Sequence, residues 1–117
     1  MIKVAVTRES GAGGVQAECG AIRKIKVCGH AGFAGRGKDI VCAAASVTVY
    51  TAAGALNVLC GAPRDCAKER DGFFELTVPR FEDGEKAHRA DIIMETAYIG
   101  FKQIEAEYRG FIKVSES

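Results

Sequence analysis

A cysteine and a histidine twelve residues apart are the two side chains of this sequence best suited to chemistry. Cys42 lies near the start of an uncharged stretch, and His30 lies upstream in a glycine-rich segment. A cysteine reacts as its thiolate, which the oriented N–H groups at the start of a helix stabilise. A nearby imidazole can take the thiol proton and later protonate a leaving group. The pair is therefore a candidate for nucleophilic catalysis, with Cys42 as nucleophile and His30 as general base.

The segments around this pair predict how the chain brings the two side chains together. Residues 40–63 contain no charged side chain, and Asp39 just before them is a favourable N-cap. We expect a helix from about Ile40 to Leu59, which places the cysteine in its first turn. Residues 29–38 contain four glycines, which predict a flexible loop that can fold back over the start of the helix.

Alternating apolar and polar residues predict strands on both sides of this helix. In the second strand, Arg23, Ile25 and Val27 are expected on one face. The order ββαββαβ corresponds to an α+β fold in which two helices pack on a mostly antiparallel five-stranded sheet, and residues 1–117 form a single domain. Strands are expected at about 2–7, 21–28, 65–70, 73–79 and 111–114, with a glycine-rich hairpin tip at 10–14 and a second amphipathic helix at about 84–108.

Composition limits the partners and cofactors of the chain. Its 117 residues are 48% hydrophobic and 26% charged, with a formal net charge of +1, which gives no electrostatic reason to expect nucleic acid as a partner. The sequence has no CxxC pair and no closely spaced Cys/His pair on a tight turn, so no metal and no cofactor are expected. The N-terminus has no signal-peptide pattern, so the cysteines are interpreted as reduced thiols of a cytoplasmic protein: Cys19, Cys28, Cys42, Cys60 and Cys66.

The uncharged stretch 40–63 is long enough to cross a bilayer by length alone. Many of its residues are small or polar, however, so no membrane span is expected. A helix without charges that does not cross a membrane is normally buried on several sides. In so short a chain the second side is expected to be covered by another subunit, which predicts a homodimer.

Other interpretations compete for the same residues. A single cysteine among apolar residues is more often a small buried hydrophobe, and helix capping alone explains Asp39. His88 lies among charged residues and is expected to face solvent. The glycine loop matches neither GxGxxG nor the Walker pattern, and Gly37–Lys38 is followed by a carboxylate that would repel phosphate.

Two blocks of sequence carry a longer signature, GHAGFA at residues 29–34 and GKDIVCAAAS at residues 37–46. They resemble the signature of the ribosomal-processing cysteine protease family, Prp, and the length and element order are similar to the family across nearly the whole chain. The resemblance implies an endopeptidase with a Cys42/His30 dyad. Further residues of the signature, which the resemblance gives supporting or substrate-binding roles, are Gly29, Gly32, Gly37, Asp39 and Ser46.

The resemblance also implies a substrate. The family is homodimeric and removes the N-terminal extension of large-subunit ribosomal protein twenty-seven, and its flexible loop closes over a peptide with aromatic residues near the cleavage point. The expected reaction runs through an acyl-enzyme, with backbone N–H groups near the helix start stabilising the oxyanion. The sequence departs from the family in the longer, glycine-rich segment 10–20 and at Arg36, which puts the substrate in doubt more than the reaction.

The alternative hypothesis is a non-catalytic, homodimeric, ribosome-associated module that clamps a peptide with its glycine loop. This module predicts that iodoacetamide alkylates Cys42 no faster than the other four cysteines, whereas a protease predicts preferential alkylation of Cys42. A thiol redox protein is a third hypothesis, which the missing CxxC pair disfavours.

Overall fold

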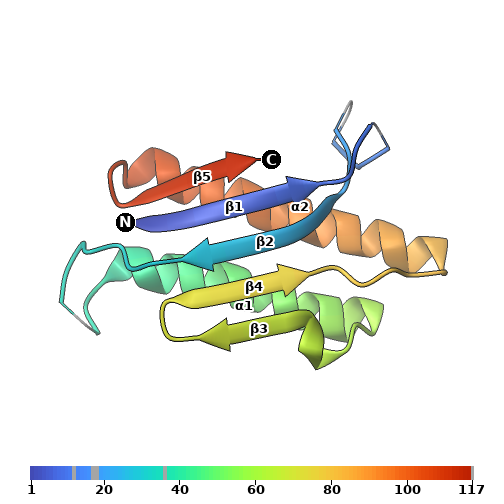
Figure 1. Ribbon diagram of the computed structural model, residues 1–117, viewed down its shortest axis with the longest axis horizontal. Coiled ribbons are helices and arrows are strands. Elements are labelled where there is room, and N and C mark those ends of the chain that lie inside the picture. Colours follow the sequence, from blue (N-terminus) through green and yellow to red (C-terminus); the bar gives the residue numbers. More distant parts are fainter. Residues whose placement is uncertain (12, 17–18, 36, 117) are drawn as a thin grey trace.

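Two helices cover one face of a five-stranded sheet (Figure 1). This computed structural model describes residues 1–11, 13–16, 19–35 and 37–116. The α+β order ββαββαβ expected from the sequence is confirmed. In chain order the elements are β1 (Ile2–Arg8), β2 (Ile22–Cys28), α1 (Ile40–Cys60), a short 3-10 helix (Arg64–Cys66), β3 (Ala67–Arg70), β4 (Phe73–Thr77), α2 (Gly84–Glu107) and β5 (Ile112–Glu116).

The sheet has the strand order β3-β4-β2-β1-β5. Its neighbours pair antiparallel except β1 and β5, which run parallel. The end of β2, the start of α1 and the β3–β4 turn therefore meet at one end of the molecule, on the left in Figure 1. The loop that carries His30 leaves the sheet at this same end.

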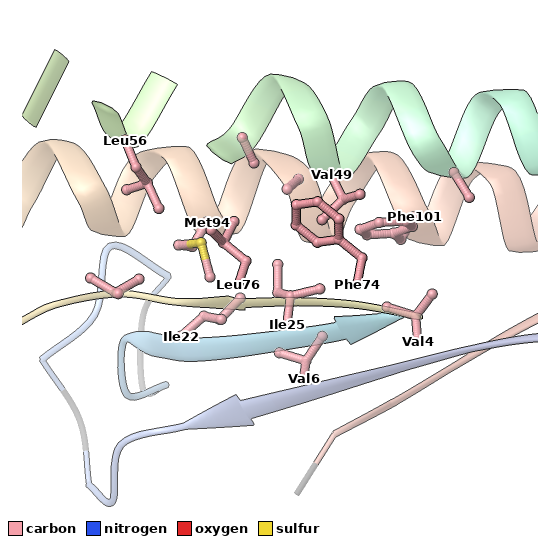
Figure 2. Close-up of a cluster of buried hydrophobic side chains, with 14 of the residues drawn as sticks. Val4, Val6, Ile22, Ile25, Val49, Leu56, Phe74, Leu76, Met94 and Phe101 are labelled. Carbon is pink, nitrogen blue, oxygen red and sulfur yellow. The ribbon is translucent and has the colours of Figure 1, made fainter. Parts of the chain in front are cut away.

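The core lies between the helices and the covered face of the sheet, where the labelled side chains of Figure 2 converge. Alternate residues of β1 point inward, and Ile2, Val4 and Val6 are all at most 2% exposed. On each helix, residues spaced by three and four positions point into the core, because 3.6 residues per turn place them on one face. The buried stripe of α1 is Val41, Ala45, Val49, Ala52, Leu56 and Cys60, and that of α2 includes Ala90, Met94, Ala97 and Phe101.

The expectation that Arg23 shares a face with Ile25 is wrong. Thr7 pairs with Lys24 but Arg8 pairs with Ile22, so the register shifts by one residue at this point. Beyond such an irregularity, the side chains that would have pointed outward point toward the core, and those that would have pointed inward point toward solvent. Ile22 is therefore buried at 1% exposure. Arg23 is partly exposed and donates a hydrogen bond from Nη2 to the Val78 carbonyl oxygen at 2.9 Å.

Several element boundaries differ from the expected ones. The helix α1 ends at Gly61, which adopts the left-handed conformation (φ 71°, ψ 22°) and bonds back to the carbonyls of the last turn. The chain after Pro63 forms a 3-10 turn, so β3 is shorter than the predicted 65–70. Expectations that concern Arg36 and positions 12, 17 and 18 of the segment 10–20 lie outside the described residues.

The two sides of α1 differ in burial. Opposite its buried stripe, Val47 is 60% exposed and Val58 79%. Within the described residues, α1 is the one helix long and apolar enough to cross a membrane, a test that the core helix of a soluble protein also passes.

Candidate active site

Cys42 lies in the first turn of α1, as the capping signal predicts. The backbone of Asp39 is extended (φ −84°, ψ 99°), and its Oδ1 accepts the N–H groups of Val41 and Cys42, each at 3.0 Å. Val41 and Ala45 point into the core, so Cys42 stands at the edge of the buried stripe and is only partly buried. The helix thus holds the sulfur beside its positive end without sealing it from solvent.

The same carboxylate ties the glycine loop to the helix. Asp39 Oδ2 accepts the N–H of Phe33 at 3.0 Å and that of Ala34 at 3.4 Å. The hydrogen bonds that Asp39 accepts lower its pKa below the ordinary value, and the bond from the Cys42 N–H has the largest effect. Asp39 is therefore ionised at neutral pH, and one side chain joins the loop to the first turn of α1.

A backbone N–H of the loop points at the candidate nucleophile. Ala31, which is 4% exposed, donates its N–H to the Cys42 sulfur at 3.3 Å. A donor in this position stabilises negative charge on the sulfur more than it stabilises the neutral thiol. The loop therefore contributes to the sulfur's environment together with the start of the helix.

His30 is exposed and lines the same cavity as Cys42. Both residues lie within the described ranges, and no hydrogen bond joins the imidazole to the sulfur. A long separation in the absence of substrate does not by itself exclude proton transfer, because such contacts often tighten only in the substrate complex. The structure therefore brings the two side chains into one cavity without connecting them.

The cavity has a volume of about 390 Å³ and lies between α1 and the β3–β4 hairpin. Cys42, Ser46 and Tyr50 line it from the helix, since residues four apart share a helical face. Gly29 also lines it, whereas Gly32 and Gly37 are not among its lining residues and have no neighbour on the side where a Cβ would lie. The remaining lining residues are Ile2, Val27, His30, Ala45, Val49, Glu69, Arg70, Asp71, Gly72, Phe73 and Phe74.

Sequence reasoning missed the hairpin side of this cavity. The Tyr50 hydroxyl hydrogen-bonds to the Glu69 carboxylate, which raises the pKa of Tyr50, and the Tyr50 ring packs edge-on against Phe74 at 5.4 Å between centroids. These contacts join α1 to the hairpin across the cavity. The four-residue spacing from Cys42 through Ser46 was a signal for Tyr50, but nothing in the local sequence pointed to Glu69.

An aromatic contact anchors the glycine loop at a second point. The Phe33 ring packs edge-on against Tyr108 at 5.6 Å and against Phe111 at 5.1 Å between centroids. Tyr108 caps the end of α2, and Phe111 directly precedes β5. The loop therefore rests on the α2–β5 connection as well as on Asp39.

Replacing Phe33 by alanine is expected to loosen the loop. Each lost edge-to-face pair contributes about 0.5–1.5 kcal/mol, so the Ala31 N–H should exchange with solvent roughly tenfold faster. Amide hydrogen exchange measured by NMR checks this result. The Phe33→Tyr variant keeps both ring contacts and should exchange like the parent, and an unchanged Ala31 rate in Phe33→Ala would contradict the anchor.

Comparisons with known proteins agree with this fold. The model of the family described as cysteine protease Prp matches residues 1–113. The ribosomal processing cysteine protease Prp of Bacillus subtilis (strain 168) is 32% identical over 95 residues, which cover 80% of this chain and 85% of the relative. The ribosomal processing protease Prp from S. aureus, solved with a covalently linked product peptide, matches with a TM-score of 0.81 at 25% identity over all of both chains. Its complex with a substrate peptide matches with a TM-score of 0.76.

The match extends well beyond the signature around the candidate nucleophile. The family model covers nearly the whole chain, and the structural match includes every strand and both helices. The resemblance read from residues 29–34 and 37–46 is thereby confirmed. The chain belongs to the cysteine protease Prp family.

Proposed function

We propose that this cysteine protease removes the N-terminal extension of large-subunit ribosomal protein twenty-seven, with Cys42 as nucleophile and His30 as general base. The observation that carries the proposal is the Ala31 N–H directed at the Cys42 sulfur inside a cavity that His30 also lines. The names of the relatives support processing of a ribosomal protein, and the S. aureus complexes support a peptide as substrate.

The reaction begins with transfer of the Cys42 thiol proton to the His30 imidazole. The thiolate then attacks the scissile carbonyl carbon, and the carbonyl electron pair moves to oxygen. Collapse of this tetrahedral intermediate breaks the C–N bond, and the imidazolium gives its proton to the leaving amine. Water, deprotonated by the imidazole, then attacks the thioester carbonyl, and collapse of the second tetrahedral intermediate breaks the C–S bond. The imidazolium returns its proton to the sulfur, and the new carboxylic acid loses its proton to solvent.

The oxyanion donors differ from those expected at the helix start. The N–H groups of Val41 and Cys42 are already bonded to the Asp39 side chain, and that of Ala43 is bonded to the Asp39 carbonyl. The Ala31 N–H lies beside the sulfur instead. The sulfur loses its negative charge when the C–S bond forms, and the carbonyl oxygen gains it. The Ala31 N–H can then donate its hydrogen bond to the carbonyl oxyanion.

The cavity offers a bound peptide both apolar and polar contacts. Val27, Val49 and Phe74 line it together with the two catalytic candidates, and it is open to solvent on the side of His30. Polar and charged side chains line the same cavity, including Ser46, Glu69 and Arg70. Apolar contacts together with convergent polar groups are typical of binding sites.

The extended precursor itself tests the function. Incubation with the purified chain should yield one shortened product, and sequencing of its new N-terminus should locate the cleaved bond. The precursor without its extension serves as the control and should remain intact. Absence of processing, or equal processing by the Cys42→Ala variant, would overturn the proposal.

We also propose a cytoplasmic homodimer joined through the outer faces of the helices. The five cysteines are free thiols, as a reducing compartment requires. Val47 on α1 and Ile92 on α2 are exposed and line a mostly apolar groove of about 360 Å³. Sedimentation should give twice the 12.4 kDa chain mass, and Val47→Glu should shift the equilibrium to monomer by burying a charge in the interface. A monomeric parent would contradict the dimer.

A further inference from the structure

The β3–β4 turn packs against the segment that carries His30. The turn consists of Asp71 and Gly72, and Gly72 has φ +69°, the left-handed conformation that tight two-residue hairpins need. Because Cys28 pairs with Phe73, the end of β2 lies beside the turn. The Gly29 N–H donates to the Gly72 carbonyl oxygen at 2.9 Å. The backbone immediately before His30 is thus fixed to the turn.

The imidazole itself rests on the bare Cα of Gly72. A Cβ at this position would lie 3.1 Å from His30 Nε2, 3.7 Å from Cδ2 and 3.8 Å from Cε1. The ring therefore occupies the space into which any side chain at position 72 would point. Three consecutive residues span from the turn to the nucleophile: the Gly29 N–H bonds to the turn, the His30 ring lies on it, and the Ala31 N–H reaches the Cys42 sulfur.

We propose that Gly72 is a positioning residue, which places the His30 imidazole for proton transfer with Cys42. The inference rests on the proposed dyad. In serine and cysteine proteases with a triad, a carboxylate or amide orients the histidine through a hydrogen bond. Across residues 1–11, 13–16, 19–35 and 37–116, no side chain makes such a bond to the His30 ring. Contact with Gly72, the residue of the turn that has no side chain, supplies the orientation instead.

The Gly72→Ala variant tests the role, and Gly61→Ala is its matched control. Gly61 has nearly the same backbone conformation, with φ +71°, but has no neighbour within 4 Å of a Cβ. Both variants carry the same backbone strain, and only Gly72→Ala displaces the imidazole. We expect kcat for the extended precursor to fall several-fold, up to about tenfold, in Gly72→Ala with KM unchanged, because the ring must yield by a fraction of the roughly 1 Å of misplacement that costs about 100-fold. Gly61→Ala should keep the parent kcat.

A spectroscopic readout separates positioning from loss of structure. In proton NMR spectra, the imidazole resonances of His30 should shift in Gly72→Ala, while those of the exposed His88 stay unchanged. Equal kcat losses in the two alanine variants, or unchanged His30 resonances, would overturn the inference. Should Gly72→Ala not fold, Gly72→Asn places the same Cβ against the ring with less strain, since asparagine tolerates the left-handed conformation.

A stability cycle gives an independent outcome without activity. In a His30→Ala background the added methyl has no ring to meet, so Gly72→Ala should lower Tm only as much as Gly61→Ala does. A larger loss of Tm in that background would contradict the contact. If His30→Ala itself retains cleavage, the proposed dyad fails; if it abolishes cleavage while Gly72→Ala matches Gly61→Ala, only the positioning role fails.

Discussion

Replacing Cys42 or His30 by alanine is expected to lower kcat/KM for the extended precursor by about 10⁴-fold or more. Without the sulfur no acyl-enzyme forms, and without the imidazole neither the thiol nor the leaving amine exchanges its proton. Because the two groups act as a unit, the double variant should be no less active than either single variant. Cleavage rates measured over time on gels or by mass spectrometry check both results.

Control variants keep this test specific to the site. His88→Ala changes an exposed histidine that lies outside the cavity and should keep the parent rate. The His30→Ala variant should keep its fold, since its exposed ring carries little of the core. A His30→Ala protein that cleaves within tenfold of the parent would exclude the imidazole as the general base.

Alkylation reports the nucleophile independently of any substrate. Burial raises the pKa of the Cys60 and Cys66 thiols, so both are held as unreactive neutral thiols at neutral pH. Limiting iodoacetamide should therefore label Cys42 well before these two cysteines. Equal labelling would favour a peptide-binding module without catalysis.

The parts of the site that depend on local spacing were predictable from the sequence. Asp39 and Cys42 are three positions apart, and the N-cap bond between a side chain and a backbone N–H is made within that distance. The buried stripe of α2 follows from helical periodicity in the same way, and Met94 and Phe101 are fully buried. Local rules therefore placed the candidate nucleophile in the first turn of α1 and predicted the helices that support it.

The parts that depend on strand pairing were not predictable. The contact of Gly72 with His30 exists because Cys28 pairs with Phe73, and an Asp-Gly turn signal does not say which strand lies beside the turn. The register shift at Arg8 likewise has no signature in an alternating pattern, so the inward face of the second strand was assigned wrongly at Arg23. Tertiary pairing, and not propensity, decides both features.

A buried ion pair at the opposite end of the sheet holds β1 against α2. The Arg8 guanidinium contacts both carboxylate oxygens of Glu95, and the side chains of the pair are 10% and 6% exposed. Arg8 also donates to the Gly20 carbonyl oxygen at 2.9 Å and to Glu116 at 3.1 Å. The Glu95 carboxylate, more than any other group, raises the pKa of Arg8 further above its ordinary value. The arginine is therefore charged in the folded chain at any accessible pH and needs its partner.

Removing one member of this pair is expected to cost far more stability than removing both. Glu95→Leu leaves the buried guanidinium with only Glu116 as an anionic partner. We expect the free energy of unfolding to fall by about 3–5 kcal/mol. This is a large share of the roughly 5–15 kcal/mol that stabilises a typical domain. The double variant Arg8→Met/Glu95→Leu replaces the pair by apolar side chains and should lie within about 1 kcal/mol of the parent. Urea unfolding measures both, and a double variant as unstable as Glu95→Leu would contradict this account. Because β1 ends at Arg8, on the side of the sheet away from the start of α1 (Figure 1), the folded fraction of each variant should keep the parent kcat.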